Sequence, residues 1–271
     1  FGHGRDLLWH PSSPLATWKL VDGLEAGPGA PRMLRCDPQV LAWFQGTVLP
    51  DAELLGALSP IALQDPLESW PLERTAERLN AQLERGLPVR LLVVGAPGSG
   101  RRTFGAVIAD RLRFGSCALD TTEVPPERWE DVFIRAERFA RLYGLVPVWH
   151  GQGIERRWPT TVPASALEVV ALEPDQVVSP LPGWLDERVE LPNLTIDERQ
   201  RFWAQHLPQS MRWPREERKA LVARHRLNVG QIITLGRRDP DDPEEAAAAC
   251  RELSRNHLGE LGRLLESPFL W

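Results

Sequence analysis

The residues of this sequence best placed to do chemistry lie in one glycine-rich segment, Gly95-Ala96-Pro97-Gly98-Ser99-Gly100-Arg101-Arg102-Thr103. Its glycines follow the phosphate-binding pattern G-x-x-x-x-G-K-[ST], in which backbone N–H groups and a helix N-terminus hold a diphosphate or triphosphate. Arg101 stands where the pattern has lysine. Arg102 stands where it has the hydroxyl residue that binds magnesium, with Thr103 one position late. The segment therefore predicts a nucleotide site with altered catalytic groups.

The sequence on either side of the glycines supports a phosphate-binding loop. Residues 89–94 form a short apolar run that predicts a strand, and residues 101–113 carry an apolar face that predicts a helix. The candidate ligands are ATP or ADP, with or without magnesium, and an empty site fits the sequence equally well. A glycine-rich turn with no ligand is the alternative. The candidate binding residues are Gly95, Gly98, Ser99, Gly100, Arg101, Arg102 and Thr103.

A second strand bears on catalysis. In P-loop ATPases such a strand ends in an aspartate for the magnesium shell and a glutamate that positions water. Here the predicted strand Leu145–Trp149 is followed by His150, Gly151 and Gln152, and Pro147 removes one of its ladder donors. His150 could serve as a substitute base, although a lone histidine at a strand end more often forms structural hydrogen bonds. We therefore expect no hydrolysis, and we assign no catalytic residue and no metal ligand.

Composition limits the classes of partner. The 271 residues are 42% apolar, enough for one large domain or two smaller ones, and the net charge of −5 gives no general attraction to nucleic acid or to an anionic membrane. Three widely spaced cysteines fit a reducing compartment, and no apolar run approaches the ~18 residues of a membrane span, so a cytoplasmic location is expected. Lys19 and Lys219 are the only lysines, so a general preference for arginine could also explain Arg101.

Three zones divide the chain. Residues 1–70 predict a small helical or winged-helix-like domain, with helices over 37–44 and 51–58 that Asp37 and Asp51 would cap. Residues 71–192 predict a P-loop α/β domain, and residues 193–271 a helical lid and connector. Because the first zone has few basic residues, no DNA contact is expected there.

The second zone alternates helices and strands, as a parallel α/β sheet requires. Helices are predicted over 72–83 and 127–143, closed by Gly86 and Gly144. Strands are predicted over 89–94, 116–119, 145–149, 167–172 and 188–191. The expected result is a parallel five-stranded sheet.

The third zone predicts four helices. Thr195 and Glu198 form a capping box for the first, and Pro214 opens the second. The third is expected over 229–236 and the fourth over 243–266. These helices would form a lid after the sheet.

The glycine-rich segment, Leu194–Trp203 at the start of the lid and Leu227–Ile232 before its third helix together resemble the AAA+ ATPases. More narrowly, they resemble the degenerate first module of bacterial tandem-AAA proteins, in which a segment like Leu34–Leu41 precedes a P-loop of the GSGRR type. The resemblance covers about Leu34 to Trp271. It implies a ring-forming machine, a hexamer in the full-length protein, that remodels other proteins, with a second, intact ATPase module after the long helix.

The resemblance transfers only some site residues. Gly95, Gly98, Gly100, Arg101 and Thr103 match the phosphate loop, whereas the acidic pair has no counterpart. Gly230 matches the region of a second-sensor arginine, but Gln231 and Ile232 follow it, so no sensor is assigned. Arg188 lies near the place of an arginine finger, and with Asp186 and Glu187 beside it we interpret it as part of a surface ion pair.

The predicted function is a pseudo-ATPase module with a regulatory or structural role, which binds ATP or ADP weakly or not at all. Its partners would be further copies of itself and an unidentified protein, with no nucleic acid and no membrane. The alternative is an active ATPase in which arginine replaces the P-loop lysine. A winged-helix DNA-binding regulator is a third idea, which the acidic balance disfavours.

Overall fold

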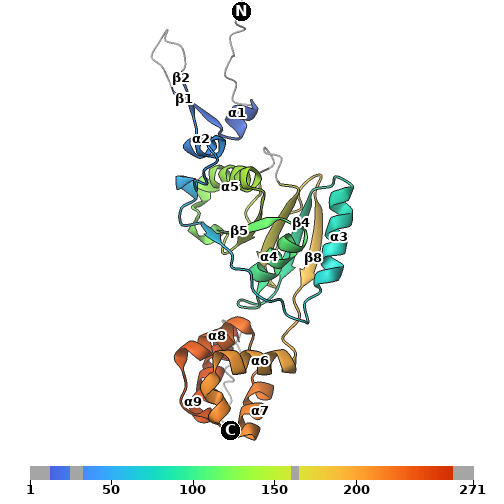
Figure 1. Cartoon of the computed structure of the whole chain (residues 1–271), viewed down its shortest axis with the longest axis vertical. Helices are drawn as coiled ribbons and strands as arrows, with labels where there is room; N and C mark the ends of the chain where they lie inside the picture. The colour runs from blue at the N-terminus through green and yellow to red at the C-terminus, as the bar shows by residue number, and fades with distance from the viewer. Residues whose placement is uncertain (1–12, 25–32, 160–164, 259–271) are drawn as a thin grey trace, which may run out of the picture. The chain divides into compact units, whose positions relative to one another are not determined.

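The computed structural model describes residues 13–24, 33–159 and 165–258 (Figure 1). They belong to two compact units, which are described separately. The sheet unit comprises Phe1–Gln64, Leu72–Val94 and Arg102–Val189. The helical unit comprises Asp65–Pro71, Gly95–Arg101 and Glu190–Trp271, so it includes most of the glycine-rich loop.

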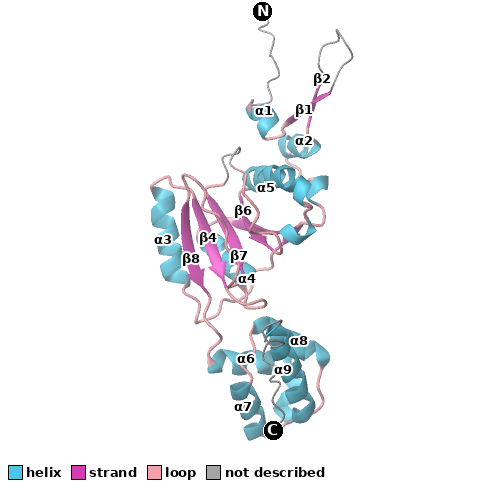
Figure 2. Ribbon diagram, turned by 180° about the vertical axis from the view of Figure 1, so that it is seen from behind, coloured by secondary structure: helices cyan, strands magenta, loops and turns pink. Residues whose placement is uncertain are grey.

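A six-stranded sheet forms the sheet unit, with the strand order β3-β5-β6-β7-β4-β8 (Figure 2). The pairs β4/β7, β5/β6 and β6/β7 are parallel, whereas β3 is antiparallel to β5. The prediction of five strands missed β3, which is short and contains a proline at the edge of the sheet. The strands are β3 (Leu58–Pro60), β4 (Val89–Val94), β5 (Gly115–Asp120), β6 (Leu145–His150), β7 (Leu167–Leu172) and β8 (Leu185–Glu190).

Pro147 lies in β6, an interior strand of this sheet. The register of β6 with β7 begins only at Val148, opposite Val169, and continues at Trp149, opposite Val170. Because proline has no N–H to donate, the ladder between these strands is confined to the end of β6 that follows it. The unusual interior proline therefore coincides with a short ladder.

Three main helices accompany the sheet, namely α3 (Leu72–Glu84), α4 (Arg101–Arg111) and α5 (Trp129–Tyr143). The predicted positions are confirmed, with α5 shortened because single 3-10 turns, η2 (Thr121–Glu123) and η3 (Pro126–Arg128), occupy the chain before it. Gly144 ends α5 with φ +64°, a left-handed conformation that glycine adopts readily.

Aromatic rings from α5, β6 and the following loop form the centre of the sheet unit's core. Trp149 stacks on Phe133 with centroids 5.3 Å apart, and Trp129 and Trp158 meet Trp149 edge-on at 5.5 Å. All four side chains are buried. Offset and edge-on contacts of this kind stabilise a core beyond the burial of their area.

The N-terminal segment contributes α1 (Pro14–Thr17), a hairpin of β1 (Val21–Leu24) and β2 (Met33–Cys36), and α2 (Pro38–Phe44). The helix predicted over 37–44 is confirmed, and Asp37 caps it by accepting from the N–H of Gln39 at 2.9 Å. The helix predicted over 51–58 is wrong. Asp51 caps only a 3-10 turn, η1 (Ala52–Leu54), and Gly56, with φ +97°, lies outside helical geometry before β3 begins.

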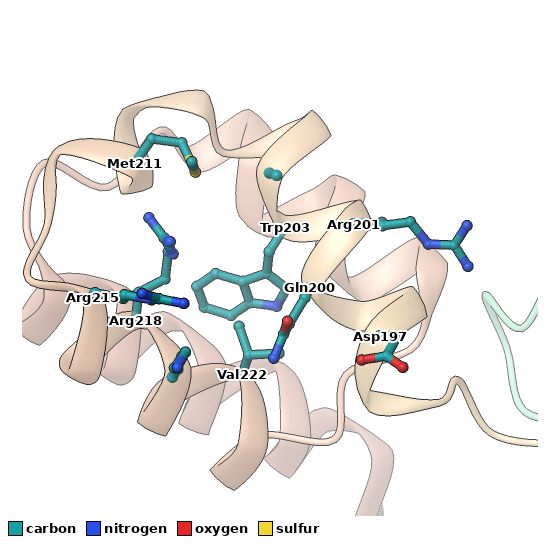
Figure 3. A pocket seen from close by; sticks show the side chains of 10 residues that line it. Asp197, Gln200, Arg201, Trp203, Met211, Arg215, Arg218 and Val222 are labelled. Carbon is teal, nitrogen blue, oxygen red and sulfur yellow. The ribbon is translucent and has the colours of Figure 1, made fainter.

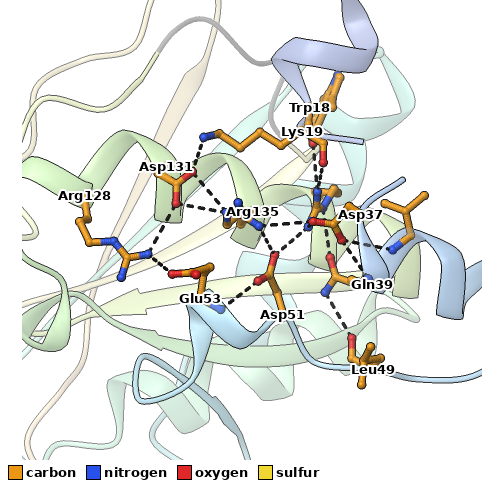
Figure 4. Close-up of polar contacts among 12 residues, drawn as sticks. Trp18, Lys19, Asp37, Gln39, Leu49, Asp51, Glu53, Arg128, Asp131 and Arg135 are labelled. Carbon is orange, nitrogen blue, oxygen red and sulfur yellow. Dashed lines mark hydrogen bonds and ion pairs between the residues drawn. The ribbon is translucent and has the colours of Figure 1, made fainter. Parts of the chain in front are cut away.

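Two buried aspartates tie this segment to α5 (Figure 4). Asp51 accepts from Arg138 at 2.7 Å and from Arg135 at 3.0 Å, and the Asp37 carboxylate lies 3.1 Å from Arg138. Lys19 pairs with Asp131 at the same face of α5. Each buried charge has several opposite charges around it. These ion pairs compensate for the free energy lost when the charged groups are removed from water.

Two further carboxyl groups, Glu137 and Glu168, are fully buried in the sheet unit. Glu137 accepts from the N–H of Ser165 at 2.8 Å, and burial raises its pKa to about 7. Glu168 faces Arg90 in the β4/β7 register, while Arg90 itself pairs with Asp186 at 2.8 Å. Neither oxygen of Glu168 has a hydrogen-bond partner among the described residues, and burial, followed by the charge of Glu137, raises its pKa well above the usual value.

The helical unit contains α6 (Ile196–His206), the 3-10 helix η4 (Pro208–Arg212), α7 (Arg215–Arg224), α8 (Val229–Arg238) and α9 (Pro243–Leu258). The capping box of Thr195 and Glu198 is confirmed, and Asn228 with Gln231 forms a second one before α8. Four helices were predicted here and are found, although residues 259–266 of the predicted last helix lie outside the described residues. No described helix has the length and apolar character to cross a membrane.

Candidate nucleotide site

The glycine-rich loop has the backbone geometry of an anion-binding nest. Gly98 and Gly100 adopt φ values of +83° and +91° with Ser99 between them, whose N–H donates to Ala96 at 3.0 Å. Alternating left- and right-handed residues turn successive N–H groups toward one side. No described residue accepts a hydrogen bond from the N–H of Gly98 or Gly100. These two N–H groups are therefore available to an anion.

The carbonyl side of the same loop is engaged by the start of α8. The N–H of Gly230 donates to the Gly98 carbonyl at 2.9 Å, and the side-chain amide of Asn228 donates to the Pro97 carbonyl at 2.8 Å. A Cβ on Gly230 would lie 2.8 Å from the Cα of Gly98, closer than real contacts allow. Both glycines are thus needed for two backbones to approach each other.

Trp70 closes another side of the loop. A Cβ on Gly100 would lie 2.8 Å from the indole ring of Trp70, which is buried. Glycine is therefore required at the third glycine position of the motif for two reasons, the left-handed φ and the packing of an aromatic ring against it. The sequence had not indicated Trp70 as part of the site, because a lone tryptophan before a helix carries no motif.

A small cavity of about 100 Å³ lies beside the loop within the helical unit. Pockets for drug-sized ligands usually measure about 300–1,000 Å³. The hydroxyl of Ser99 lines this cavity and has no hydrogen-bond partner among the described residues. This cavity is therefore too small for a whole nucleotide. The other polar and apolar residues that line the cavity include Leu67, Asn193, Leu194, Asn228, Val229 and Gln231.

The two arginines of the motif have different surroundings. Arg101 is partly buried, with its Nη1 atom shielded from solvent, and its Cγ lies 3.6 Å from where a Cβ of Gly95 would be. In the sheet unit, Arg102 is exposed and its Nη1 lies 3.4 Å from Nε2 of His150, while Thr103 is partly buried in α4. The guanidinium at the magnesium position thus faces the residue that replaces the acidic pair.

The end of β6 differs from a catalytic strand end in its backbone as well as in its side chains. Gly151 has φ +102°, and a Cβ there would lie 2.2 Å from an oxygen of Asp120 and 3.1 Å from the N–H nitrogen of Thr122. A glutamate at this position would be strained and would collide with the neighbouring turn. The backbone at this position is therefore specific for glycine.

These residues do not fit magnesium. The ion prefers an octahedron of oxygen ligands from carboxylates, hydroxyls and water. Arg102 brings a positive charge to this place, and the Asp120 carboxylate already caps Thr122 at 3.0 Å and lies 3.9 Å from His150. No described group of three His, Cys, Asp or Glu residues could hold a metal ion.

At the position compared with a second sensor, two residues make structural contacts. Gly230 contacts the phosphate loop directly, and the side chain of Gln231 caps Asn228 at 2.9 Å rather than acting as a sensor. The carboxylates beside Arg188 pair with other arginines, Asp186 with Arg90 and Glu187 with Arg78 at 2.9 Å.

Comparison with known proteins gives matches to solved structures only. No family model and no curated protein sequence matches the chain. A point mutant of Thermotoga maritima RuvB matches with a TM-score of 0.46 and 16% identity over 72% of this chain and 73% of that one. PCH-2 of C. elegans matches with a TM-score of 0.43 and 11% identity over 69% of this chain and 66% of that one, slightly less than two thirds of its length.

Both matches have TM-scores below 0.5 and identities below 25%. The predicted fold class, a P-loop α/β sheet followed by a helical module, is confirmed by the strand order and by the loop after β4. The degenerate tandem module, the domain boundaries and the site residues stay predictions.

Proposed function

We propose that this chain is a non-hydrolysing P-loop module of the AAA+ type that binds ATP or ADP weakly or not at all. The observation that carries the proposal is the end of β6, where His150 contacts Arg102 and Gly151 leaves no room for a carboxylate. Without an acidic residue there, neither magnesium nor the attacking water is positioned for phosphoryl transfer. In this proposal the module has a regulatory or structural role in a ring-forming, protein-remodelling assembly.

The loop geometry supports weak binding rather than none. Its open N–H groups suit a phosphate, but the contact with α8 and the small cavity oppose a complete nucleotide. A complete nucleotide exceeds the cavity beside the loop, so in this proposal only its phosphates contact the loop. The affinity for nucleotide is therefore low, while the attraction for phosphate remains.

Calorimetric titration with ATP and ADP, with magnesium or with a chelator, tests this function together with a phosphate-release assay. We expect dissociation constants weaker than about 100 μM, little dependence on magnesium and no turnover above a protein-free blank. Micromolar, magnesium-dependent binding with turnover would support the alternative of an active ATPase and overturn the proposal. The mass of the chain in solution measures self-association independently of nucleotide.

A further inference from the structure

A groove on the helical unit, away from the glycine-rich loop in sequence, has the character of a binding site. Its volume is about 370 Å³, and it opens between α6, η4 and α7. Its lining includes the buried side chains of Trp203 and Val222 and the exposed side chains of Ala204 and Met211. The groove falls within the size range of sites for a side chain or a short peptide segment.

Cations on α7 border this apolar surface. Arg215 and Lys219 are exposed, and Arg218 is half-buried and donates to the Ser210 carbonyl at 3.3 Å. Arg201 also borders the groove, but it points away from the indole and pairs with Glu68 at 2.8 Å (Figure 3). Asp197 is the only carboxylate among the lining residues that the structure describes. In a chain of net charge −5, this is a local excess of positive charge.

The indole of Trp203 adds a second, independent feature. Figure 3 shows the ring among the side chains that line the groove, with Arg215 and Arg218 on one side of it. Trp203 is only 1% exposed, and its Nε1 has no hydrogen-bond partner among the described residues. A buried tryptophan N–H usually has an acceptor, because an unpaired buried donor has lost its hydrogen bonds to water without replacing them. The groove therefore lacks an acceptor as well as a negative charge.

The geometry points to this groove as the docking site for an acidic peptide segment of a partner protein, with glutamate or aspartate next to a large apolar side chain. The apolar side chain packs against Trp203 and Met211. A carboxylate then pairs with Arg215 or Lys219, and a carboxylate or backbone carbonyl accepts from the indole N–H. One ligand thus supplies both the negative charge and the hydrogen-bond acceptor that the groove lacks.

A peptide fits this groove better than a nucleic acid does. Nucleic-acid sites present a stripe of cations that follows the phosphate backbone. Here Asp197 lines the groove and Glu216 lies 3.9 Å from Lys219, so negative charges interrupt the basic surface. A single carboxylate beside an apolar side chain can fit between them.

Fluorescence anisotropy on the full chain tests the site. The probe is a short fluorescein-labelled peptide in which glutamates flank a Leu-Phe pair, compared with the same peptide carrying glutamines. We expect the glutamate peptide to bind about tenfold more tightly at low salt, with the difference shrinking at high salt. Arg215→Glu with Lys219→Glu should weaken its binding at least about tenfold.

Matched variants distinguish binding in the groove from general electrostatic attraction to the protein. Arg212→Glu with Arg224→Glu makes the same change of charge at exposed positions outside the groove lining, and should change the affinity less than about threefold. Trp203→Phe keeps a ring but removes the N–H, and should weaken binding several-fold while circular dichroism shows the helices intact. Equal binding of the two peptides, equal effects of the two charge variants, or tighter binding of a labelled DNA oligonucleotide would overturn the assignment.

Discussion

The Nη1 atom of Arg102 lies 3.4 Å from Nε2 of His150. These two residues occupy the positions where a magnesium-dependent nucleotide site needs oxygen ligands. Each substitution alone could follow from the arginine-rich composition or from chance. Their contact shows that the two altered positions form one local arrangement, in which a guanidinium faces an imidazole. At this scale the sequence was informative, since both replacements are visible in it. What it could not show is that Gly151 has a left-handed φ against Asp120, which excludes a carboxylate sterically.

Restoring the motif therefore should not restore catalysis. In Arg101→Lys with Arg102→Thr, we expect ATP to bind several-fold more tightly in magnesium, because a compact ammonium and a hydroxyl return to the loop. Hydrolysis should stay at the blank level, because β6 still ends without an acidic pair. Calorimetry and phosphate release measure the two effects.

The control for this restoration is Arg85→Lys, the same change of side chain at an exposed position outside the loop. It should leave ATP affinity unchanged. Measurable turnover in the restored variant would show that another carboxylate positions water, and would contradict the role given to the strand end.

At the scale of elements, the loop and α8 are joined by backbone contacts that no motif predicts. Sequence patterns found the helix and its neighbours because capping residues and apolar spacing are local signals. The approach of Gly98 to Gly230 joins positions 132 residues apart, the difference of the two sequence numbers, and depends on the absence of two side chains. The only sequence sign was a glycine at the first turn of a helix, where alanine would be the better helix former.

Gly230→Ala tests this contact. A methyl group there should push α8 from the loop, so we expect faster hydrogen exchange at the amide of residue 230 and a loss of about 1–3 kcal/mol in the stability of the helical unit. Asn228→Asp should act in the same direction more weakly, because it keeps the helix cap but removes the donor to Pro97. Amide exchange followed by NMR measures both variants.

Thr234→Ala is the matched control in the same helix, since its hydroxyl bonds only within α8, to the Gly230 carbonyl at 2.9 Å. Exchange at residue 230 should hardly change in this variant. If Gly230→Ala leaves exchange at this amide as slow as in the native chain, the contact does not hold α8.

At the scale of the whole molecule, the fold class was predictable and the buried polar interior was not. Short apolar runs and capping signals located the interior strands and most helices, whereas β3 and the 3-10 turn after Asp51 follow from tertiary contacts and the φ of Gly56. Buried carboxyl groups such as Glu168 sit in strands or helices that otherwise look ordinary. Nothing near Glu168 in the sequence shows that Arg90 lies opposite it on the neighbouring strand β4.

Glu168 gives the whole chain a predictable pH dependence. Its pKa is raised in the folded state above the unfolded value of about 4.3, so the folded state binds the proton more tightly. This group's effect on stability is therefore neutral below about pH 4 and increasingly unfavourable as pH rises toward the folded pKa. Glu168→Gln removes the charge, and should stabilise the sheet unit by about 1–3 kcal/mol at pH 8 with little effect near pH 4.

Urea denaturation at the two pH values, followed by the fluorescence of the buried tryptophans, measures this difference. Glu155→Gln makes the same change at an exposed position and should shift stability by less than about 0.5 kcal/mol at either pH. A gain from Glu168→Gln that is equal at both pH values would point to packing rather than to the proton.

The position of Lys219 in the groove makes the protein suited to selective covalent labelling. Lys19 and Lys219 are the only lysines, and Lys19 is engaged with Asp131 while about half of the Lys219 side chain is exposed. An amine-reactive reagent at mildly alkaline pH can therefore modify few side chains of this sequence. The yield of adduct at Lys219, read by peptide mass, would report directly whether a ligand covers the groove.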